Sequence, residues 1–320
     1  MECVCSVVVP VYNEEAVLGE TYKRLTAVME ATGISYEILF INDGSADKSA
    51  EIIIGFIKTD KNVRLINFSR NFGHQPAITA GMDYARGDAI VVIDADLQDP
   101  PEVIPEMLGK WKEGCDVVYG KRTSREGESF FKKISANVYY RFLRSMTSVD
   151  IPVDAGDFRL IGRRVADAMK RVNEKNRYMR GLISWVGFRQ EYVEYARDKR
   201  FAGETKYPLS KMLTFAMNGV AAFSHKPLKA ATSVGVFLSL FGFVYMIVAI
   251  CQKLFTDTTI QGWTSLIILL LLTQGIILVV LGFMGEYIGR IYDEVKNRPI
   301  YIVAEEIENT GGTAKDTTGA

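Results

Sequence analysis

Residues 89–102 read AIVVIDADLQDPPE, and the fold class is decided here. Ala89–Ile93 is a short, continuous apolar run with the β-branched content of a strand that is buried on both faces. Two carboxylates, Asp94 and Asp96, follow at positions i and i+2, so they project in one direction if the extended backbone continues. A helical pattern then begins at Pro101. A buried strand, an acidic turn and a helix in this order are typical of an open α/β sheet.

The same alternation extends in both directions, from Cys5 to Gly120. The expected strands are rich in Val and Ile, and they are Cys5–Val11, Glu37–Ile41, Val63–Asn67, Ala89–Ile93 and Val117–Tyr119. Helical spacing of apolar residues falls between them, at Glu15–Thr32, Lys48–Thr59, Pro76–Ala85 and Pro101–Glu113. We therefore predict a parallel, doubly wound α/β sheet whose ligands bind at the carboxyl ends of its strands.

Composition and charge narrow the class of protein. The chain has 320 residues, 48% of them hydrophobic, and its 38 Lys and Arg balance 38 Asp and Glu. A formal net charge of zero gives no support for a nucleic-acid partner. The four cysteines lack the spacing of a metal site or a disulfide framework. Because the N-terminus also lacks a secretory signal, we expect a reduced, cytoplasmic catalytic part.

Two uncharged apolar segments near the C-terminus predict a membrane anchor. Residues 230–251 and 263–285 contain no charged side chain, and each reaches the ~20 residues that cross a ~30 Å hydrocarbon core. We expect them to form a two-helix transmembrane hairpin over residues 230–289. Lys and Arg flank its outer ends, so the positive-inside rule places both termini and the catalytic domain in the cytoplasm. Glycines at intervals of seven would allow close packing, either within the hairpin or in a homo-oligomer.

Two basic segments precede the predicted hairpin. Residues 121–146 and 197–229 each carry five more basic than acidic side chains, with aromatic residues among them. A basic amphipathic stretch directly before a span is typical of an interfacial helix on anionic lipid, although a helix packed on the sheet would show the same pattern. The chain then divides into a catalytic domain (1–205), an interfacial amphipathic region (206–229), the hairpin (230–289) and a cytoplasmic tail (290–320). The Thr/Gly-rich part of the tail after Ile307 is expected to be disordered.

Asp94 and Asp96 are candidate metal ligands. Two carboxylates at the end of a buried strand can share one hard cation, and Gln98 offers a further oxygen nearby. Mg²⁺ or Mn²⁺ held by one or two carboxylates and by substrate phosphates is a usual way to bind a nucleotide diphosphate. Acidic pairs at strand ends are common, so the D-x-D pattern alone is weak evidence for a metal site. The interpretation depends on the position of the pair, at the carboxyl end of the fourth strand of the expected parallel sheet.

A second polar turn, Asn42-Asp43-Gly44-Ser45, follows the second expected strand. A tight turn with a helix cap accounts for Gly44 and Ser45. It does not account for Asp43, whose carboxylate is placed to accept hydrogen bonds from a base or a ribose.

Signatures of other enzyme classes are missing from the sequence. G-x-G-x-x-G and G-x-x-x-x-G-K-[ST] do not occur, which removes the main support for a dinucleotide oxidoreductase or a P-loop enzyme. The two histidines, His74 and His225, are far apart in sequence, which disfavours a catalytic triad or a His-rich zinc site. We expect His74 to order a loop rather than to act as a base.

Four motifs occur in order: VVVPVYNEE from Val7, INDGSAD from Ile41, NFGHQPAITAG from Asn71 and DADLQDPPE from Asp94. Together they resemble the inverting family-2 glycosyltransferases, which have the GT-A fold, a Rossmann-like nucleotide-sugar-binding domain. The chain is most similar to the polyprenyl-phosphate glycosyltransferases of the bactoprenol glucosyltransferase type, which are related to the dolichol-phosphate mannose synthases. The resemblance covers about residues 5–230, and the expected hairpin suits the bactoprenol branch.

The resemblance implies roles for the matching residues. It implies a nucleotide pocket lined by Pro10, Tyr12, Glu14, Asp43 and Asp94, with Asp43 on the base. It implies that the metal and the diphosphate are held by Asp94, Asp96 and Gln98. Asp157, in the stretch DAGDFRL, matches the position of the family's catalytic acidic residue. Asn42 stands where the family often has Asp, which weakens nothing essential if Asp43 makes the base contact.

The chemistry of the acceptor refines the role of Asp157. A lipid phosphate has a second pKa near ~6 and is largely a dianion at neutral pH, so it attacks without a base. The enzyme must instead bring two anions together and stabilise the departing diphosphate, which requires arginines as well as a metal. We expect Asp157 to orient an arginine or to organise the sugar rather than to remove a proton.

Candidate cations for the acceptor phosphate are Arg122, Arg125, Arg141 and Arg200. Arg122 and Arg200 are the preferred catalytic pair, because arginine can bind phosphate through two parallel hydrogen bonds. Attraction to the lipid surface would explain each arginine equally well.

The predicted activity is the inverting transfer of a hexose, with glucose preferred, from a UDP-sugar to undecaprenyl phosphate at the cytoplasmic face of the membrane. The expected partners are the UDP-sugar, undecaprenyl phosphate, Mg²⁺ or Mn²⁺ and the lipid bilayer. Mannose from GDP-mannose, or another UDP-sugar, is an alternative donor, and a non-catalytic nucleotide-sugar-binding membrane module is the alternative from another class. A processive polysaccharide synthase is disfavoured because the sequence has no Q-x-x-R-W motif and too few spans to form a channel.

Overall fold

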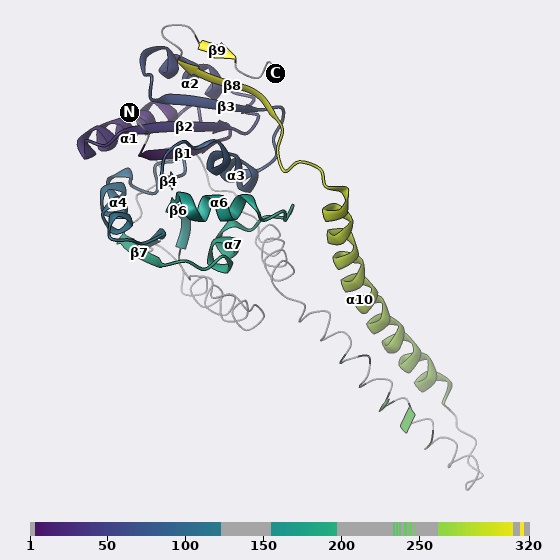
Figure 1. The fold of residues 1–320 in the computed structure, drawn as a ribbon. Coiled ribbons are helices and arrows are strands. Elements are labelled where there is room, and N and C mark those ends of the chain that lie inside the picture. Colours follow the sequence, from purple (N-terminus) through teal and green to yellow (C-terminus); the bar gives the residue numbers. More distant parts are fainter. Residues whose placement is uncertain are drawn as a thin grey trace, which may run out of the picture.

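The structure is a computed structural model that describes residues 4–122, 155–196, 262–309 and 314–316, with eight isolated positions between 233 and 247. The described residues form a nine-stranded sheet with helices on both faces, and one long helix leads away from it (Figure 1). The strand order is β7-β5-β6-β4-β1-β2-β3-β8-β9, which places β1 at the centre.

The strands and helices predicted between Cys5 and Gly120 are confirmed, with ends that differ by a few residues. The strands are β1 (Cys5–Val11), β2 (Tyr36–Asn42), β3 (Val63–Phe68), β4 (Ala89–Val92) and β5 (Val117–Arg122). The helices are α1 (Leu18–Thr32), α2 (Ser49–Thr59), α3 (His74–Tyr84) and α4 (Ile104–Lys112). A single 3-10 turn, η1 (Pro101–Val103), precedes α4.

Two apolar layers, one on each face of the sheet, hold this part together. Val7 and Val9 of β1 belong to the layer that contains residues of α1, α2 and α4. Val8 faces the other layer, with α3, α6 (Arg163–Lys170) and α7 (Met179–Trp185). All seven residues of β1 are buried, as a continuous Val run predicts for a strand covered on both faces. The doubly wound arrangement is therefore confirmed.

The sheet is mixed, so the prediction of a parallel sheet is wrong beyond β4. β3, β2, β1 and β4 run parallel to one another. β6 (Ala155–Gly162) lies between β4 and β5 and is antiparallel to both, and β7 (Gln190–Tyr195) is parallel to β5. The sequence does not reveal β6 because Asp157 and Arg159 interrupt the apolar run by which a central strand is recognised.

The C-terminal segment completes the opposite edge of the sheet. β8 (Val303–Asn309) pairs antiparallel with β3, and β9 (Ala314–Asp316) pairs with β8. The expected disorder after Ile307 is therefore wrong at residues 308–309 and 314–316. β8 covers the open edge of β3, whose backbone N–H and C=O groups need partners.

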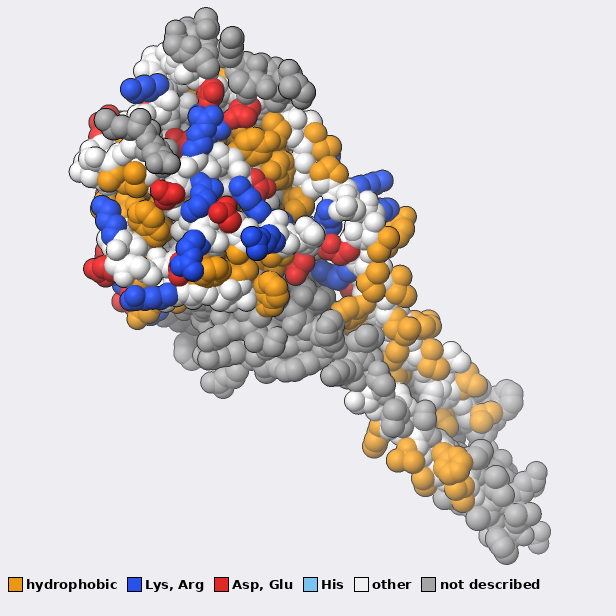
Figure 2. All heavy atoms as spheres, viewed as in Figure 1, with side chains coloured by type: hydrophobic (Ala, Val, Ile, Leu, Met, Phe, Trp, Pro, Cys, Tyr) orange, Lys and Arg blue, Asp and Glu red, His pale blue; other side chains and the backbone are white. Residues whose placement is uncertain are grey.

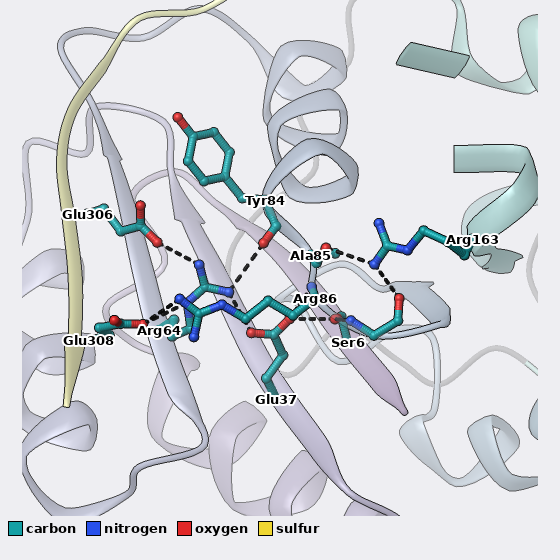
Figure 3. Close-up of polar contacts among 10 residues, drawn as sticks. Ser6, Glu37, Arg64, Tyr84, Ala85, Arg86, Arg163, Glu306 and Glu308 are labelled. Carbon is teal, nitrogen blue, oxygen red and sulfur yellow. Dashed lines mark hydrogen bonds and ion pairs between the residues drawn. The ribbon is translucent and has the colours of Figure 1, made fainter. Parts of the chain in front are cut away.

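Five charged residues bind β8 to the sheet, and we call them the edge cluster: Glu37, Arg64, Arg86, Glu306 and Glu308. The side chain of Arg64 is only 5% exposed, and its Nη1 and Nη2 lie 2.6 Å from carboxylate oxygens of Glu37 and Glu306. Arg86 Nη2 lies 2.7 Å from Glu308 Oε2. Figure 3 shows these side chains converging between β8 and the neighbouring strands. The cluster thus fixes a segment that lies more than two hundred residues away in sequence.

The helix α10 (Trp263–Lys296) has 34 residues and ends at Asn297, which adopts a left-handed conformation. Within the described part of the chain, its segment Thr273–Lys296 is the one helix long and apolar enough to cross a membrane. Figure 2 shows apolar side chains along α10, whereas Lys, Arg, Asp and Glu side chains gather on the sheet domain. The second predicted span is therefore helical, but it continues to Lys296 rather than ending at Gly285.

The first predicted span, 230–251, lies outside the described residues apart from isolated helical positions. The interfacial region 206–229 lies outside them entirely. The two-helix hairpin and the interfacial helices therefore remain predictions.

Short contacts tie α10 back to the sheet domain. Tyr301, between α10 and β8, donates a 2.9 Å hydrogen bond to Asp83, and its ring stacks on Phe68 with the centroids 5.2 Å apart. In the last turn of α10, Glu294 Oε1 accepts a 2.8 Å hydrogen bond from the Lys175 backbone amide. These contacts fix the sheet domain relative to the C-terminal end of α10.

Candidate active site

The polar turns singled out in the sequence meet at one edge of the sheet. Because β1, β2 and β4 are parallel neighbours, their carboxyl ends lie side by side. Val11 is in register with Asn42, so the turn after β1 and the turn after β2 begin next to each other. The sheet topology thus brings Tyr12–Glu14, Asp43 and Asp94–Asp96 to the same edge.

Reciprocal hydrogen bonds join the turns after β1 and β2. Asn13, with a positive φ of 57°, accepts a 2.8 Å bond at Oδ1 from the Ala46 amide, and its own amide donates a 3.0 Å bond to Ser45 Oγ. The Glu14 amide donates to Ser49 Oγ at 3.0 Å. Tyr12 is 49% exposed at this rim. The turn is rigid, and Tyr12 is free to contact a ligand.

Asp43 is buried and organises the loop that leads into α3. Its two carboxylate oxygens accept hydrogen bonds from the backbone amides of Phe72 and Gly73, at 2.6 and 2.9 Å. Burial raises the pKa of Asp43, although these two bonds and the nearby His74 oppose the increase. The predicted contact with a nucleotide base remains a prediction. Asp43 also has a structural role, because its two hydrogen bonds hold the backbone just before His74.

Asp94 and Asp96 occupy a sharply turned loop after β4. The buried hydroxyl of Thr21 donates a 2.7 Å hydrogen bond to the carbonyl of Ala95, and Leu97 has a positive φ of 57°. Asp96 Oδ1 accepts a 3.1 Å bond from the Gln98 amide. Burial raises the pKa of Asp94 to about 6, and the charges of nearby carboxylates add to this increase while His74 opposes it. A cation bound here would relieve that repulsion.

The donor set fits a hard divalent cation that is shared with a substrate. Among the described residues, no group of three or more His, Cys, Asp and Glu side chains is arranged to hold a metal. Mg²⁺ characteristically binds through one or two carboxylates plus substrate phosphates rather than in an all-protein cage. The carboxylates of Asp94 and Asp96 and the side-chain amide oxygen of Gln98 offer such a partial set, and their role as ligands remains a prediction.

Asp157, in β6, lies across from Asp94. Arg180 of α7 binds both of its carboxylate oxygens, with Nε at 2.9 Å from Oδ1 and Nη2 at 3.3 Å from Oδ2. Arg159 Nη2 lies 3.7 Å from Oδ1. Burial alone would raise the pKa of Asp157, but the hydrogen bond from His74 and the charge of Arg180 hold it well below its usual value. Arg180 thus occupies both carboxylate oxygens of Asp157, and the expected orienting role of this residue stays a prediction.

His74 lies beside two carboxylates of the candidate site, and the prediction that it orders a loop rather than acts as a base stays a prediction. It is the first residue of α3, and its Nε2 lies 3.5 Å from Asp94 Oδ1 and 3.4 Å from Asp157 Oδ2. Burial lowers the pKa of His74, but the hydrogen bond to Asp157 and the charge of Asp94 outweigh burial and raise it. A lone histidine in sequence gives no sign of its partners, although His74 does belong to the quoted motif NFGHQ.

Arg122 is the predicted phosphate-binding arginine that the structure describes. It ends β5, is 17% exposed in its side chain, and donates hydrogen bonds to Tyr195 Oη and Asp99 Oδ1 at 3.3 and 3.5 Å. The other candidates, Arg125, Arg141 and Arg200, lie outside the described residues. Sequence reasoning missed Arg180 and Tyr195, which no motif marks, and Arg159, which lies in the same DAGDFRL stretch as Asp157.

Comparison with known proteins gives consistent matches. Residues 6–169 match the glycosyl transferase family 2 domain. The uncharacterized glycosyltransferase YkcC of Bacillus subtilis is 62% identical over 306 residues, which are 95% of each chain. The SfII prophage-derived bactoprenol glucosyl transferase of Shigella flexneri is 41% identical over 298 residues, 93% of this chain and 96% of that protein. Among solved structures, S. aureus TarS in complex with UDP-GlcNAc aligns with a TM-score of 0.47 and 16% identity, over 68% of this chain and 66% of that one.

Proposed function

Because the chain belongs to glycosyl transferase family 2, we propose that it transfers glucose from a UDP-sugar to undecaprenyl phosphate at the cytoplasmic face of the membrane. One observation carries the proposal: the acidic turn of Asp94 and Asp96 faces an arginine-bound carboxylate, Asp157, at the carboxyl edge of the sheet. Relatives named as bactoprenol glucosyl transferases match over nearly the whole chain and support the lipid acceptor.

The donor half of the site is the acidic turn. Asp94, Asp96 and Gln98 would hold Mg²⁺ or Mn²⁺ beside the diphosphate, with Tyr12 and Asp43 near the nucleoside. When bound, the metal supplies positive charge that stabilises the departing diphosphate. Hydrogen bonds already join the turns after β1 and β2 without a donor, so little ordering of these turns is needed on binding.

The acceptor half needs cations rather than a base. An oxygen of the lipid phosphate attacks the anomeric carbon from the side opposite the UDP leaving group, so the new C–O bond forms as the old one breaks and the configuration inverts. A phosphate dianion carries no proton that must be removed first. Arg122 would bind this phosphate, with Arg125, Arg141 and Arg200 as further candidates. Asp157 would hold Arg180, and thereby orient the cationic wall of the site.

The membrane half of the proposal is supported by α10. Its apolar segment is exposed along its length, and the contacts of Tyr301 and Glu294 tie it to the sheet domain. A lipid acceptor can therefore keep its chain in the bilayer while its phosphate reaches the domain. The multi-pass topology, with both termini in the cytoplasm, completes this proposal.

The test measures lipid-linked sugar directly. The protein in nanodiscs is given undecaprenyl phosphate, Mn²⁺ or Mg²⁺, and radiolabelled UDP-glucose, other UDP-sugars or GDP-mannose, and label is counted in the organic phase. We expect transfer from UDP-glucose that a chelator abolishes. Asp167→Asn, an exposed carboxylate on α6, is the matched control and should transfer normally.

Each other result has a definite meaning. Transfer from a different donor would correct the sugar and keep the reaction. If UDP binds but no donor labels the lipid, the enzyme proposal is contradicted in favour of a nucleotide-sugar-binding module.

A further inference from the structure

Arg122 is held in place by groups on two other segments. β5 and β7 are parallel neighbours, and their register pairs Arg122 with Tyr195. Asp99, in the loop after β4, is 1% exposed, and its Oδ1 contacts both of these side chains. Arg122, the proposed phosphate-binding arginine at the end of β5, thus contacts a buried tyrosine and a buried carboxylate.

The hydroxyl of Tyr195 stands between the arginine and the carboxylate. It donates a 2.5 Å hydrogen bond to Asp99 Oδ1 and accepts a 3.3 Å bond from Arg122 Nε. Arg122 Nη2 reaches the same Asp99 oxygen only at 3.5 Å. The short hydrogen bond to Asp99 comes from Tyr195, so the Asp99 carboxylate does not bind the guanidinium through two short hydrogen bonds. Other N–H groups of Arg122 thereby stay available for a ligand.

Two glycines make the space for this arrangement. A Cβ on Gly156 would lie 2.7 Å from Arg122 Nη2, so the guanidinium rests directly on the backbone next to Asp157. A Cβ on Gly120 would lie 2.7 Å from Tyr195 Cε1. The Tyr195 ring also meets Phe158 edge-on, with the centroids 5.7 Å apart and an interplanar angle of 82°. The Tyr195 ring is thus packed between Gly120 and Phe158, and the Arg122 guanidinium lies against Gly156.

We propose that Tyr195 and Asp99 are positioning residues that hold the Arg122 guanidinium over Gly156 and so set where the acceptor phosphate binds. The inference rests on the proposed function. A free arginine side chain loses rotamer entropy when it is fixed. An arginine that is ordered before the phosphate arrives avoids that loss on binding. Burial raises the pKa of Tyr195, with the charge of Asp99 adding to it, so the phenol stays protonated and keeps donating.

The direct test is Tyr195→Phe, with Tyr192→Phe as the control. The phenylalanine keeps the ring but removes the hydroxyl, so Asp99 can pair directly with Arg122 and draw it away from the ligand. We expect KM for undecaprenyl phosphate to rise roughly tenfold, with the KM for UDP-glucose and the melting temperature unchanged. Tyr192, on the same strand and 43% exposed, should tolerate the change. An unchanged acceptor KM in Tyr195→Phe, or equal rises in both KM values, would overturn the proposal.

Adding Asp99→Asn to Tyr195→Phe tests the competition itself. Without the negative charge at position 99, Arg122 is no longer drawn away from the ligand. The contacts that hold it in place are also lost, so we expect the double variant to recover only part of the acceptor KM. No recovery would overturn this part of the argument.

Gly156→Ala provides an independent variant in case Tyr195→Phe does not fold. The added methyl group displaces the guanidinium while Tyr195 and Asp99 remain, so the acceptor KM should again rise. Gly109→Ala is its control, since a Cβ there meets nothing within 4 Å. A normal acceptor KM in Gly156→Ala contradicts the inference. If the wild-type protein binds UDP but transfers nothing to lipid, the proposed function has failed instead, and the two failures are distinguishable.

Discussion

Two charge clusters in this molecule, each containing a buried arginine, use the same kinds of side chain to opposite effect. The edge cluster, defined above, joins β8 to the sheet, and the site cluster consists of His74, Asp94, Asp157, Arg159 and Arg180. Each contains an arginine that is almost fully buried, namely Arg64 at 4% and Arg159 at 5% exposure. In the edge cluster that arginine has carboxylates at 2.6 Å on two sides. In the site cluster, the nearest carboxylate oxygen of Asp157 is 3.7 Å from Arg159.

The two clusters also differ in how far burial shifts the pKa values of their side chains. Burial lowers the pKa of Arg64, but Glu37 outweighs burial and raises it above the usual value. Burial lowers the pKa of Arg159 to about 10 and raises that of Asp94 to about 6, because their neighbours compensate incompletely. In the edge cluster, the charge of Arg64 is paired by Glu37, Glu306 and Glu308 of the chain itself, so we expect this cluster to serve stability. The site cluster holds charges that a cation and a phosphate would stabilise, which is the property expected of a binding site.

The largest expected effect is on the edge cluster. Arg64→Met leaves Glu37 buried without its cation, and breaking a buried pair in this way costs about 3–5 kcal/mol of unfolding free energy. Arg86→Met is the control, because Arg86 is 53% exposed and such a pair is worth about 0–1 kcal/mol. Denaturant unfolding of the detergent-solubilised protein measures both. Equal losses in the two variants would contradict the structural role of Arg64.

The next effect separates activity from stability. Asp96→Asn keeps an oxygen that can accept the Gln98 amide bond but loses the charge for the metal, so transfer should fall at least about 10²-fold. Its unfolding free energy should change by less than about 1 kcal/mol, because size and hydrogen bonding are conserved. Transfer and unfolding are measured on the same preparation. A variant that unfolds easily but transfers normally would reverse the assignment of this turn.

The smallest effect is a pH dependence of stability that belongs to Asp157. In the folded state, burial alone would raise the pKa of Asp157, but His74 and Arg180 lower it. The ionised carboxylate therefore stabilises the fold at pH values above its unfolded pKa of about 3.9. That contribution is lost as the pH falls through the lower folded value. Between pH 5 and 3, unfolding free energy should therefore fall less steeply in Asp157→Asn than in wild type. A common slope for wild type and Asp157→Asn would contradict the pairing of Asp157 with His74 and Arg180.

The comparison also explains what the sequence could predict. β1 and β4 are continuous Val and Ile runs, so their burial, their place in the sheet and the carboxylates at their ends follow from local pattern. β6 and β8 were missed because Asp157, Arg159 and the glutamates of β8 resemble solvent-exposed residues until their partners are known. Those partners are distant: Arg64 and Glu306 are 242 residues apart in sequence. Arg180 and Tyr195 could not be found for the same reason, since their roles exist only after β6 and β7 join the sheet.

The most direct test of the account is the structure of the lipid product. After incubation with UDP-glucose, undecaprenyl phosphate and Mn²⁺, the organic phase is analysed by mass spectrometry and by phosphorus and proton NMR. We expect one glucose on one lipid phosphate, joined through a β-anomeric linkage, because the phosphate attacks opposite the leaving UDP. An α-linked product, a lipid pyrophosphate, or free glucose with unmodified lipid would contradict it.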